Sequence, residues 1–204
     1  MSTQTGTVYL VDDDPSMCKA LTRLVGSQKL KAHSFSSARE FLEHGAPDHP
    51  SCLVLDIQLP GLSGLELQTE LTKRNIELPI IFITGHGDVR SSVRAMKQGA
   101  VDFLLKPFNP KDLANVIQQA LAKDLRRHAA AAERQELEHR LQTLTPRERE
   151  VFDRVIRGLL NKQIADELGA SEQTVKVHRH RVMEKMRVKS LADLVQGAVK
   201  IGLV

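Results

Sequence analysis

Short runs of apolar residues alternate with helical patterns in the first half of the chain. Runs this short favour buried strands over helices, and they lie at residues 8–11, 52–55, 80–83 and 101–105, with a weaker candidate at 31–35. Amphipathic helices are expected near residues 15–27, 36–44, 64–74, 89–98 and 110–124. Alternating strands and helices predict an α/β fold, a doubly wound five-stranded parallel sheet with helices on both faces.

The helical pattern continues past residue 124 without a glycine. Residues 125–143 are rich in Ala, Glu, Arg, Gln and Leu, which predicts a long linker helix between two domains. Leu137, Leu141 and Leu144 share one face of this helix. Two interpretations stay open, a short coiled-coil seam and a solvated spacer helix, because fewer than three clean heptads are present.

Four helical segments follow the linker, and Gly158 and Gly169 separate three of them. The segments are 146–157, 161–168, 172–187 and 190–201. Thr145 is a suitable N-cap residue for the first of them, and Glu148 completes a capping box. The expected organisation is therefore an α/β domain at 1–124, a helical linker at 125–143 and an all-α domain at 144–204.

The composition is that of a folded, water-soluble chain. Hydrophobic residues make up 41% and charged residues 26% of the 204 positions, too apolar for a disordered chain. No apolar run reaches the ~18 residues that a membrane span needs, and Met1–Thr7 has neither a basic start nor a hydrophobic core. We therefore expect a cytoplasmic protein, with Cys18 and Cys52 as buried, reduced thiols.

The charge is divided unevenly along the chain. Residues 1–124 hold 13 Lys and Arg against 14 Asp and Glu, whereas residues 125–204 hold 16 against 11. The basic excess is concentrated at 172–189, which indicates a surface suited to nucleic acid.

A group of carboxylates follows two of the predicted strands. Asp12, Asp13 and Asp14 come directly after the first strand, and Asp56 ends the third. Because the carboxyl ends of parallel strands meet at one edge of a sheet, these side chains should converge. Clustered carboxylates repel one another unless a cation neutralises them, and an oxygen-rich site of this kind suits Mg²⁺.

Two further strand ends supply complementary groups. Thr84 ends the fourth strand with a hydroxyl, and Lys106 follows the fifth with a compact cation. A metal ion, a lysine and a hydroxyl around one aspartate form a receptacle for a phosphoryl group, whose charge positioned cations and donors stabilise.

Residues 7–124 resemble the receiver domains of two-component response regulators, whose flavodoxin-like fold carries the same residue types at the same strand ends. The resemblance rests on Asp12-Asp13, Asp56, Thr84 and Lys106-Pro107. It implies that Asp56 is the phosphoacceptor and that Asp13, Asp56 and the Gln58 carbonyl hold Mg²⁺, with Asp12 helping through water. It also implies phosphoryl contact by Lys106, a switch formed by Thr84 and Phe103, and a cis Lys106-Pro107 bond.

The second half contains a helix, a tight turn and a capped second helix. The first helix begins at Asn161-Lys162, Gly169 lies in the turn, and the second helix covers 172–187. This is a helix-turn-helix arrangement. An exposed cationic face on the second helix, with Lys176 and His180 outward, is what major-groove binding requires.

Residues 144–201 resemble the LuxR-type helix-turn-helix domain. The likeness is carried by Leu144–Glu150, Asn161–Ala165 and Thr174–Arg179. It implies that base edges face Lys176, Val177 and His180. It also implies phosphate contacts from Thr174, Arg179, Asn161 and Lys162, and a pairing role for the last helix around Val195.

A receiver joined to a LuxR-type domain resembles the FixJ/NarL family. The long linker helix and the sequence motifs at 162–165 and 177–180 favour the FixJ and StyR branch. The resemblance implies a transcription factor, not an enzyme, which is activated by phosphotransfer from a sensor histidine kinase. It also implies that the phosphorylated regulator dimerises, binds double-stranded promoter DNA and interacts with RNA polymerase. A rival interpretation is a haloacid-dehalogenase-type phosphatase, because Asp12-x-Asp14-x-Ser16 satisfies its nucleophile motif; Asp12 would then be the nucleophile and Asp14 the general acid. A third is a regulator that works without phosphorylation.

Overall fold

The computed structural model describes residues 6–45, 47–85 and 89–204, and the chain divides into two compact units. The first unit is Met1–His128 and the second is Ala129–Val204. Each unit has its own hydrophobic core and is considered by itself below.

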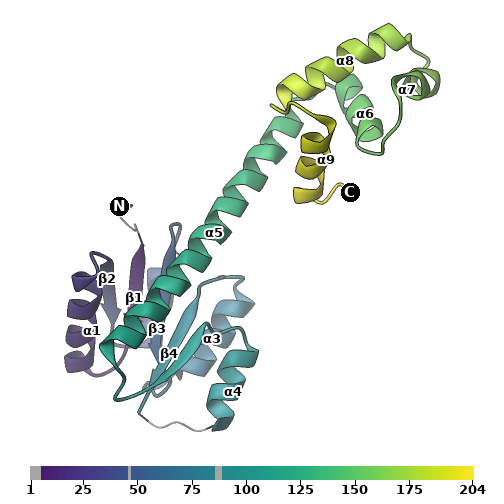
Figure 1. Cartoon of the computed structure of the whole chain (residues 1–204). Helices are drawn as coiled ribbons and strands as arrows, with labels where there is room; N and C mark the ends of the chain where they lie inside the picture. The colour runs from purple at the N-terminus through teal and green to yellow at the C-terminus, as the bar shows by residue number, and fades with distance from the viewer. Residues whose placement is uncertain (1–5, 46, 86–88) are drawn as a thin grey trace. The chain divides into compact units, whose positions relative to one another are not determined.

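The first unit is built on a five-stranded sheet in the order β2-β1-β3-β4-β5 (Figure 1). Every strand pair is parallel, as the sequence predicts. The strands are β1 (Thr7–Val11), β2 (Lys31–Phe35), β3 (Ser51–Asp56), β4 (Ile80–Thr84) and β5 (Asp102–Leu105). The central strands β1, β3 and β4 are buried on both faces, whereas the edge strand β2 is largely exposed and buries only Phe35, which explains its weaker apolar signal.

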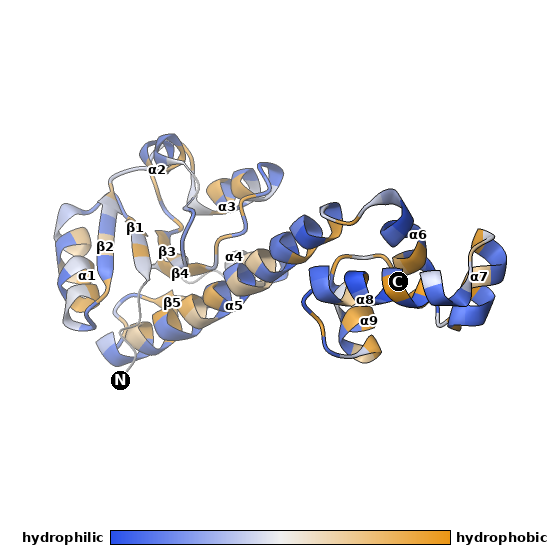
Figure 2. Cartoon of the chain, turned by 90° about the horizontal axis from the view of Figure 1, so that it is seen from above, coloured by the Kyte–Doolittle hydropathy of each residue, from blue (hydrophilic) through white to orange (hydrophobic). Residues whose placement is uncertain are grey.

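Helices cover both faces of the sheet, and successive strand residues belong to two separate cores. Leu53 and Leu55 face the core under α2, α3 and α4, and Cys52 and Val54 face the core under α1 and α5. Apolar and polar residues alternate around α1 in Figure 2, as expected for a helix with one buried face. These helices are α1 (Pro15–Ser27), α2 (Ala38–His44), α3 (Gly64–Lys73), α4 (Val89–Lys97) and α5 (Pro110–Gln142).

The second unit is all-helical and includes the end of α5. Its remaining helices are α6 (Pro146–Val155), α7 (Asn161–Leu168), α8 (Glu172–Lys185) and α9 (Leu191–Lys200). Thr145 and Glu148 form the predicted capping box at the start of α6. Gly169 ends α7 with a left-handed backbone (φ 59°), which glycine adopts without steric cost.

The leucines of the predicted linker are part of this second core. Leu137 is only 8% exposed and packs with Val151 and Ala198, and Leu141 and Leu144 are partly buried against the same cluster. Neither a seam between two copies nor a solvated spacer helix therefore describes these residues. The period-3.5 spacing reflects the one face of α5 that packs inside its own chain.

Two further expectations can be compared with the described residues. Both cysteines are free thiols, Cys52 is buried and Cys18 is half-buried, and burial raises the pKa of the Cys52 thiol far above its ordinary value. Within the described ranges, none of the helices is both long enough and apolar enough to span a membrane.

Gly64, the first residue of α3, lies directly against the end of β3. A Cβ atom at this position would lie 2.2 Å from the main-chain oxygen of Asp56 and 3.1 Å from the Cα atom of Ile57. Both atoms belong to the backbone and cannot turn away as a side chain does. The absence of a side chain at Gly64 is therefore what lets α3 begin so close to Asp56.

Substitution of Gly64 provides a test of this close approach. Gly64→Ala should lower the free energy of unfolding of the first unit by about 3 kcal/mol, because the backbone of the Asp56 turn must shift to admit the methyl group. Denaturant unfolding followed by the fluorescence of Tyr9 reports on this unit alone, since Tyr9 is the single tyrosine and the chain has no tryptophan. Gly26→Ala is the matched control, because a Cβ on that residue of α1 meets nothing within 4 Å. Equal effects of the two substitutions would contradict the steric argument.

Candidate functional site

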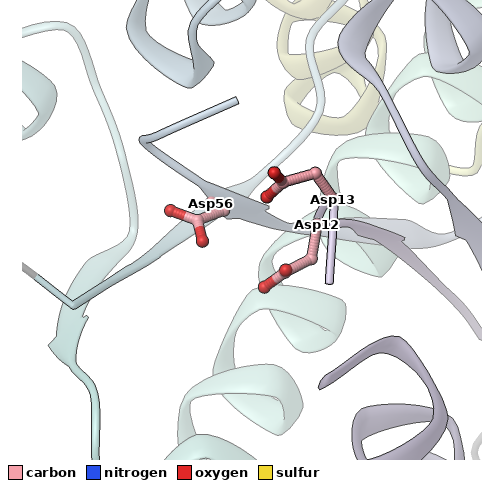
Figure 3. A group of neighbouring side chains, drawn as sticks. All are labelled: Asp12, Asp13 and Asp56. Atoms are coloured by element: carbon pink, nitrogen blue, oxygen red, sulfur yellow. The ribbon is translucent and has the colours of Figure 1, made fainter. Parts of the chain in front are cut away.

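Three carboxylates gather at the carboxyl edge of the sheet. Asp12 and Asp13 follow β1, and Asp56 is the last residue of the neighbouring strand β3. One oxygen from each lies within 4.8 Å of the others, and Figure 3 shows the three side chains drawn together from the two strand ends. Asp12 and Asp56 are buried, and Asp13 is exposed. The convergence predicted from the parallel strands is therefore present.

Lys106 joins this cluster from β5, on the far side of β4. Its Nζ donates a hydrogen bond to Oδ2 of Asp12 at 2.7 Å and to Oδ2 of Asp56 at 2.6 Å. Its main-chain N–H donates to the carbonyl of Thr84 at 2.7 Å, which ties the end of β4 to the same edge. The bond between Lys106 and Pro107 is cis, as expected from the resemblance.

Burial and pairing act in opposite directions on the charges of this site. Burial raises the pKa of Asp12 above its usual range even though Lys106 and the N–H of Asp14 donate to its carboxylate. Burial also disfavours the charged form of Lys106, but its bonds to Asp12 and Asp56 outweigh burial and raise its pKa. The difference follows from exposure, because the Asp12 side chain is 1% exposed and that of Lys106 is 18%. The site holds more negative charge than one lysine balances.

The donor set fits a hard divalent cation. Three carboxylate oxygens within reach of one point are the ligand type that Mg²⁺ prefers, and the exposed Asp13 leaves that side open to solvent. The main-chain N–H of Gln58 donates to Oδ1 of Asp56 at 2.9 Å, which holds the loop after β3 close to the carboxylates. Lys106 bonds to one oxygen, Oδ2, of Asp12 and of Asp56 and leaves Oδ1 of each carboxylate to other partners.

The remaining predicted residues of this site lie on the adjacent strands. Thr84 is completely buried at the end of β4. Phe103 is partly buried in β5 and packs against the core under α2, α3 and α4. The strand register places Phe103 beside Phe82, two residues before Thr84.

The predicted DNA-contacting residues lie on α7 and α8. Lys176, Val177 and His180 are exposed on α8, while the buried residues Val175 and Val182 fix its opposite face in the core. Val177 is an apolar side chain that is 41% exposed on this outward face of α8.

The predicted phosphate-contacting residues are partly joined to one another. Arg179 donates from Nη1 to Oδ1 of Asn161 at 3.1 Å, so a residue of α8 is linked to the first residue of α7. Lys162 and Thr174 are exposed near the beginnings of α7 and α8. The structure thus shows a cationic and polar surface over the starts of both helices.

Two buried carboxylates were not found from the sequence. Asp124 is fully buried in α5, where it accepts from the N–H of Ser51 and from Arg127. Glu148 was predicted only as a capping residue, but it is 2% exposed and accepts from Lys185 at 2.6 Å. Ser51 is 73 residues from Asp124 and Lys185 is 37 residues from Glu148, so these two contacts leave no trace in the local sequence pattern.

Comparison with known proteins agrees with both halves of this description. Residues 8–118 match the family model of the response regulator receiver domain, and residues 142–198 match that of bacterial regulatory proteins of the luxR family. The two domains together define a DNA-binding response regulator. The chain belongs to the response regulators that join a receiver to a LuxR-type domain, and it is a transcription factor.

Several named relatives cover almost the whole chain. Nodulation protein W of Bradyrhizobium diazoefficiens is 51% identical over 96% of this chain and 86% of its own length. The transcriptional regulatory protein FixJ of the same species is 39% identical over 98% of each chain. Among solved structures, the response regulator StyR is 48% identical, covers 96% of this chain and 98% of its own, and has a TM-score of 0.86.

The ion pairs of Lys106 give a prediction for the receiver. Lys106→Met should lower the free energy of unfolding of the first unit by about 3 kcal/mol, because two buried carboxylates lose their shared counter-charge. Millimolar Mg²⁺ should recover part of the loss by neutralising the same oxygens. Unfolding followed at Tyr9, with and without Mg²⁺, measures both effects. Lys111→Met, at an exposed position of α5, is the control; a Lys106→Met chain as stable as this control would show that the pairs contribute nothing.

Proposed function

We propose that Asp56 is the residue that accepts a phosphoryl group from a sensor histidine kinase. A carboxylate oxygen of Asp56 attacks the phosphorus, the bond from phosphorus to the donor histidine nitrogen breaks, and an acyl phosphate forms on Asp56. The single observation that carries this proposal is the 2.6 Å bond from Lys106 to Asp56, since it places a cation where phosphoryl oxygens would gather.

Asp12, Asp13, Asp56 and the carbonyl of Gln58 are proposed to hold Mg²⁺. The bound ion would neutralise charge on the phosphoryl oxygens. Asp13 serves as a ligand open to solvent, Asp12 supports it from a buried position, and Lys106 keeps Asp56 oriented. The phosphatase alternative has less support, because the carboxylate of Asp14, its required general acid, accepts from the N–H of Ser16 as the N-cap of α1.

The second unit is proposed to read promoter DNA with α8. Lys176, Val177 and His180 would face base edges, while Asn161, Lys162, Thr174 and Arg179 would hold the phosphates. The support is the exposure of Lys162, Thr174, Lys176, Val177 and His180, the bond between the half-buried Arg179 and Asn161, and the basic excess of this part of the chain.

Phosphorylation is proposed to promote a homodimer through α4 and β5. Val93, Met96 and Leu105 are 46%, 45% and 53% exposed there, so these two contacting elements present three apolar side chains to solvent. Thr84 and Phe103 lie on β4 and β5, so a rearrangement of both would alter this face. We further propose that the dimer acts in the cytoplasm and meets RNA polymerase at the promoter. A regulator independent of phosphorylation is the remaining alternative.

The identity of the phosphoacceptor is tested by labelling. With acetyl phosphate and Mg²⁺, wild-type chain should gain one phosphoryl group, and Asp56→Asn should gain none, as intact-mass spectrometry measures. Asp13→Asn should weaken Mg²⁺ affinity and labelling together, because the ion loses a carboxylate ligand. Label on Asp12 would support the phosphatase interpretation, and persistent labelling of Asp56→Asn would refute the assignment.

Base reading by α8 is tested at Lys176. Lys176→Ala should weaken binding to a duplex selected by the wild-type chain by about 1 to 3 kcal/mol and relax the preference at one base pair. Lys189→Ala, at an exposed basic position beyond α8, is the control for loss of charge alone. Equal losses on selected and random duplexes would make Lys176 a phosphate contact.

The proposed dimer is tested by sedimentation of the full chain. Unphosphorylated chain should be monomeric, and acetyl phosphate should produce a dimer. Leu105→Glu should prevent this dimer without reducing labelling of Asp56, since a charge is expensive to bury in an apolar contact. Thr22→Glu on α1, beside the opposite edge of the sheet, should dimerise normally. A chain that is dimeric in every state would show that another surface carries the association.

A further inference from the structure

The end of α5 contacts the C-terminal end of α8 through a set of polar side chains. Arg140 of α5 donates from Nη1 to the main-chain carbonyl of Met186, the C-cap residue of α8, at 3.2 Å. The last carbonyls of a helix have no partner within the helix, so this bond satisfies one of them. A guanidinium at this position also complements the negative end of the helix dipole.

Glu136 holds the guanidinium in this position. Its Oε1 accepts from Nε of Arg140 at 2.8 Å, one helical turn along α5, and lies 3.7 Å from Nη1 of Arg187. Arg187 directly follows the C-cap of α8 and has a left-handed backbone, φ 54°, which a non-glycine residue adopts at a cost. Glu136 therefore connects Arg140 to the residue at which the path of α8 ends.

A second contact is made by Lys185 at the end of α8, with the residue that follows α5 and with α6. Lys185, the last residue of α8, donates to the carbonyl of Thr143 at 3.0 Å and to the buried carboxylate of Glu148 at 2.6 Å. Beneath these polar contacts, Leu137 packs in the same core as Val182 and Met186 of α8. The end of α8 is thus bonded to Arg140 of α5, to Thr143 just after α5 and to Glu148 of α6, and it shares a core with Leu137 of α5.

We propose that Arg140 and Glu136 are positioning residues for DNA recognition, which fix the direction of α8 through its C-terminal end. This proposal rests on the proposed function, in which α8 contacts base edges. Lys176 lies near the beginning of α8, far from the anchored C-terminal end, so a small rotation about that end moves Lys176 more than it moves His180. Arg140 itself lies on α5 and is not assigned a contact with DNA.

Arg140 and Glu136 lie on the helix that is shared by the two units. Helix α5 begins in the receiver unit, and its last residues belong to the DNA-binding unit. Arg140 therefore links a helix that begins in the receiver unit to the C-terminal end of α8.

The experiment uses the full-length chain and a duplex that the wild-type chain enriches from a random library. The quantity measured is the ratio of affinities for this selected duplex and for random duplex of equal length. Arg140→Ala should reduce the ratio about tenfold, because a charged hydrogen bond that orients α8 is lost, while affinity for random duplex changes little. Arg140→Lys should recover most of the ratio, since an ammonium also donates to the Met186 carbonyl.

Arg134→Ala is the matched control. Arg134 forms the same kind of pair on α5, with Glu138 at 2.8 Å, and both residues of this pair are exposed. Its removal should leave the ratio unchanged. Labelling of Asp56 by acetyl phosphate should be the same for all three variants and the wild-type chain, and thermal unfolding should show that each variant is folded at the temperature of the binding measurement.

Other outcomes separate the proposal from the function on which it rests. If Arg140→Ala leaves the ratio unchanged, or lowers both affinities equally together with the melting temperature, Arg140 has no positioning role or only a stabilising one, and the proposal is wrong. If the wild-type chain enriches no duplex at all, DNA reading by α8 is itself wrong, and the role of Arg140 in it is overturned with it.

Discussion

The receiver unit depends on one constraint, which is that all five strands run in the same direction. The parallel arrangement brings the ends of β1, β3, β4 and β5 to one edge, where like-charged carboxylates must share a small volume. Lys106 reaches Asp12 and Asp56 from the edge strand and makes their proximity tolerable. Because the residual charge of the cluster is still negative, the same constraint that builds the sheet also creates a site for a cation and a phosphoryl group.

Much of this unit could be predicted because its signals are local. Strands β1, β3 and β4 are short apolar runs that are easy to recognise. The site residues Asp12, Asp56 and Lys106 each end a strand or directly follow one, so the shared direction of the strands is enough to bring them together. The short distance from Gly64 to the Asp56 carbonyl could not be predicted, since a glycine that turns and a glycine that allows close approach look alike in sequence. The burial of Asp124 could not be predicted either, because Ser51, which donates to it, lies 73 residues away in the sequence.

The second unit shows why periodicity alone was insufficient for the end of α5. Leu137, Leu141 and Leu144 have the spacing of a coiled-coil seam, but this spacing shows only that one face of the helix is apolar. Which surface covers that side depends on tertiary structure, and here it is the core formed by α6, α8 and α9. The helix-turn-helix itself was predictable, because Gly169 and the cap at Ser171 mark its turn within a few residues.

The division between the units falls inside α5, after His128. Proteins of modular construction exchange parts by recombination, and a junction is tolerated where few packing contacts are cut. A hybrid joined at residue 144, just ahead of the capping box of α6, would supply Leu137 and Arg140 from a foreign helix. A hybrid joined within the alanines at 129–132 would leave both cores with their own side chains. The natural unit of inheritance for the DNA-binding half therefore includes the last three turns of the helix that precedes it.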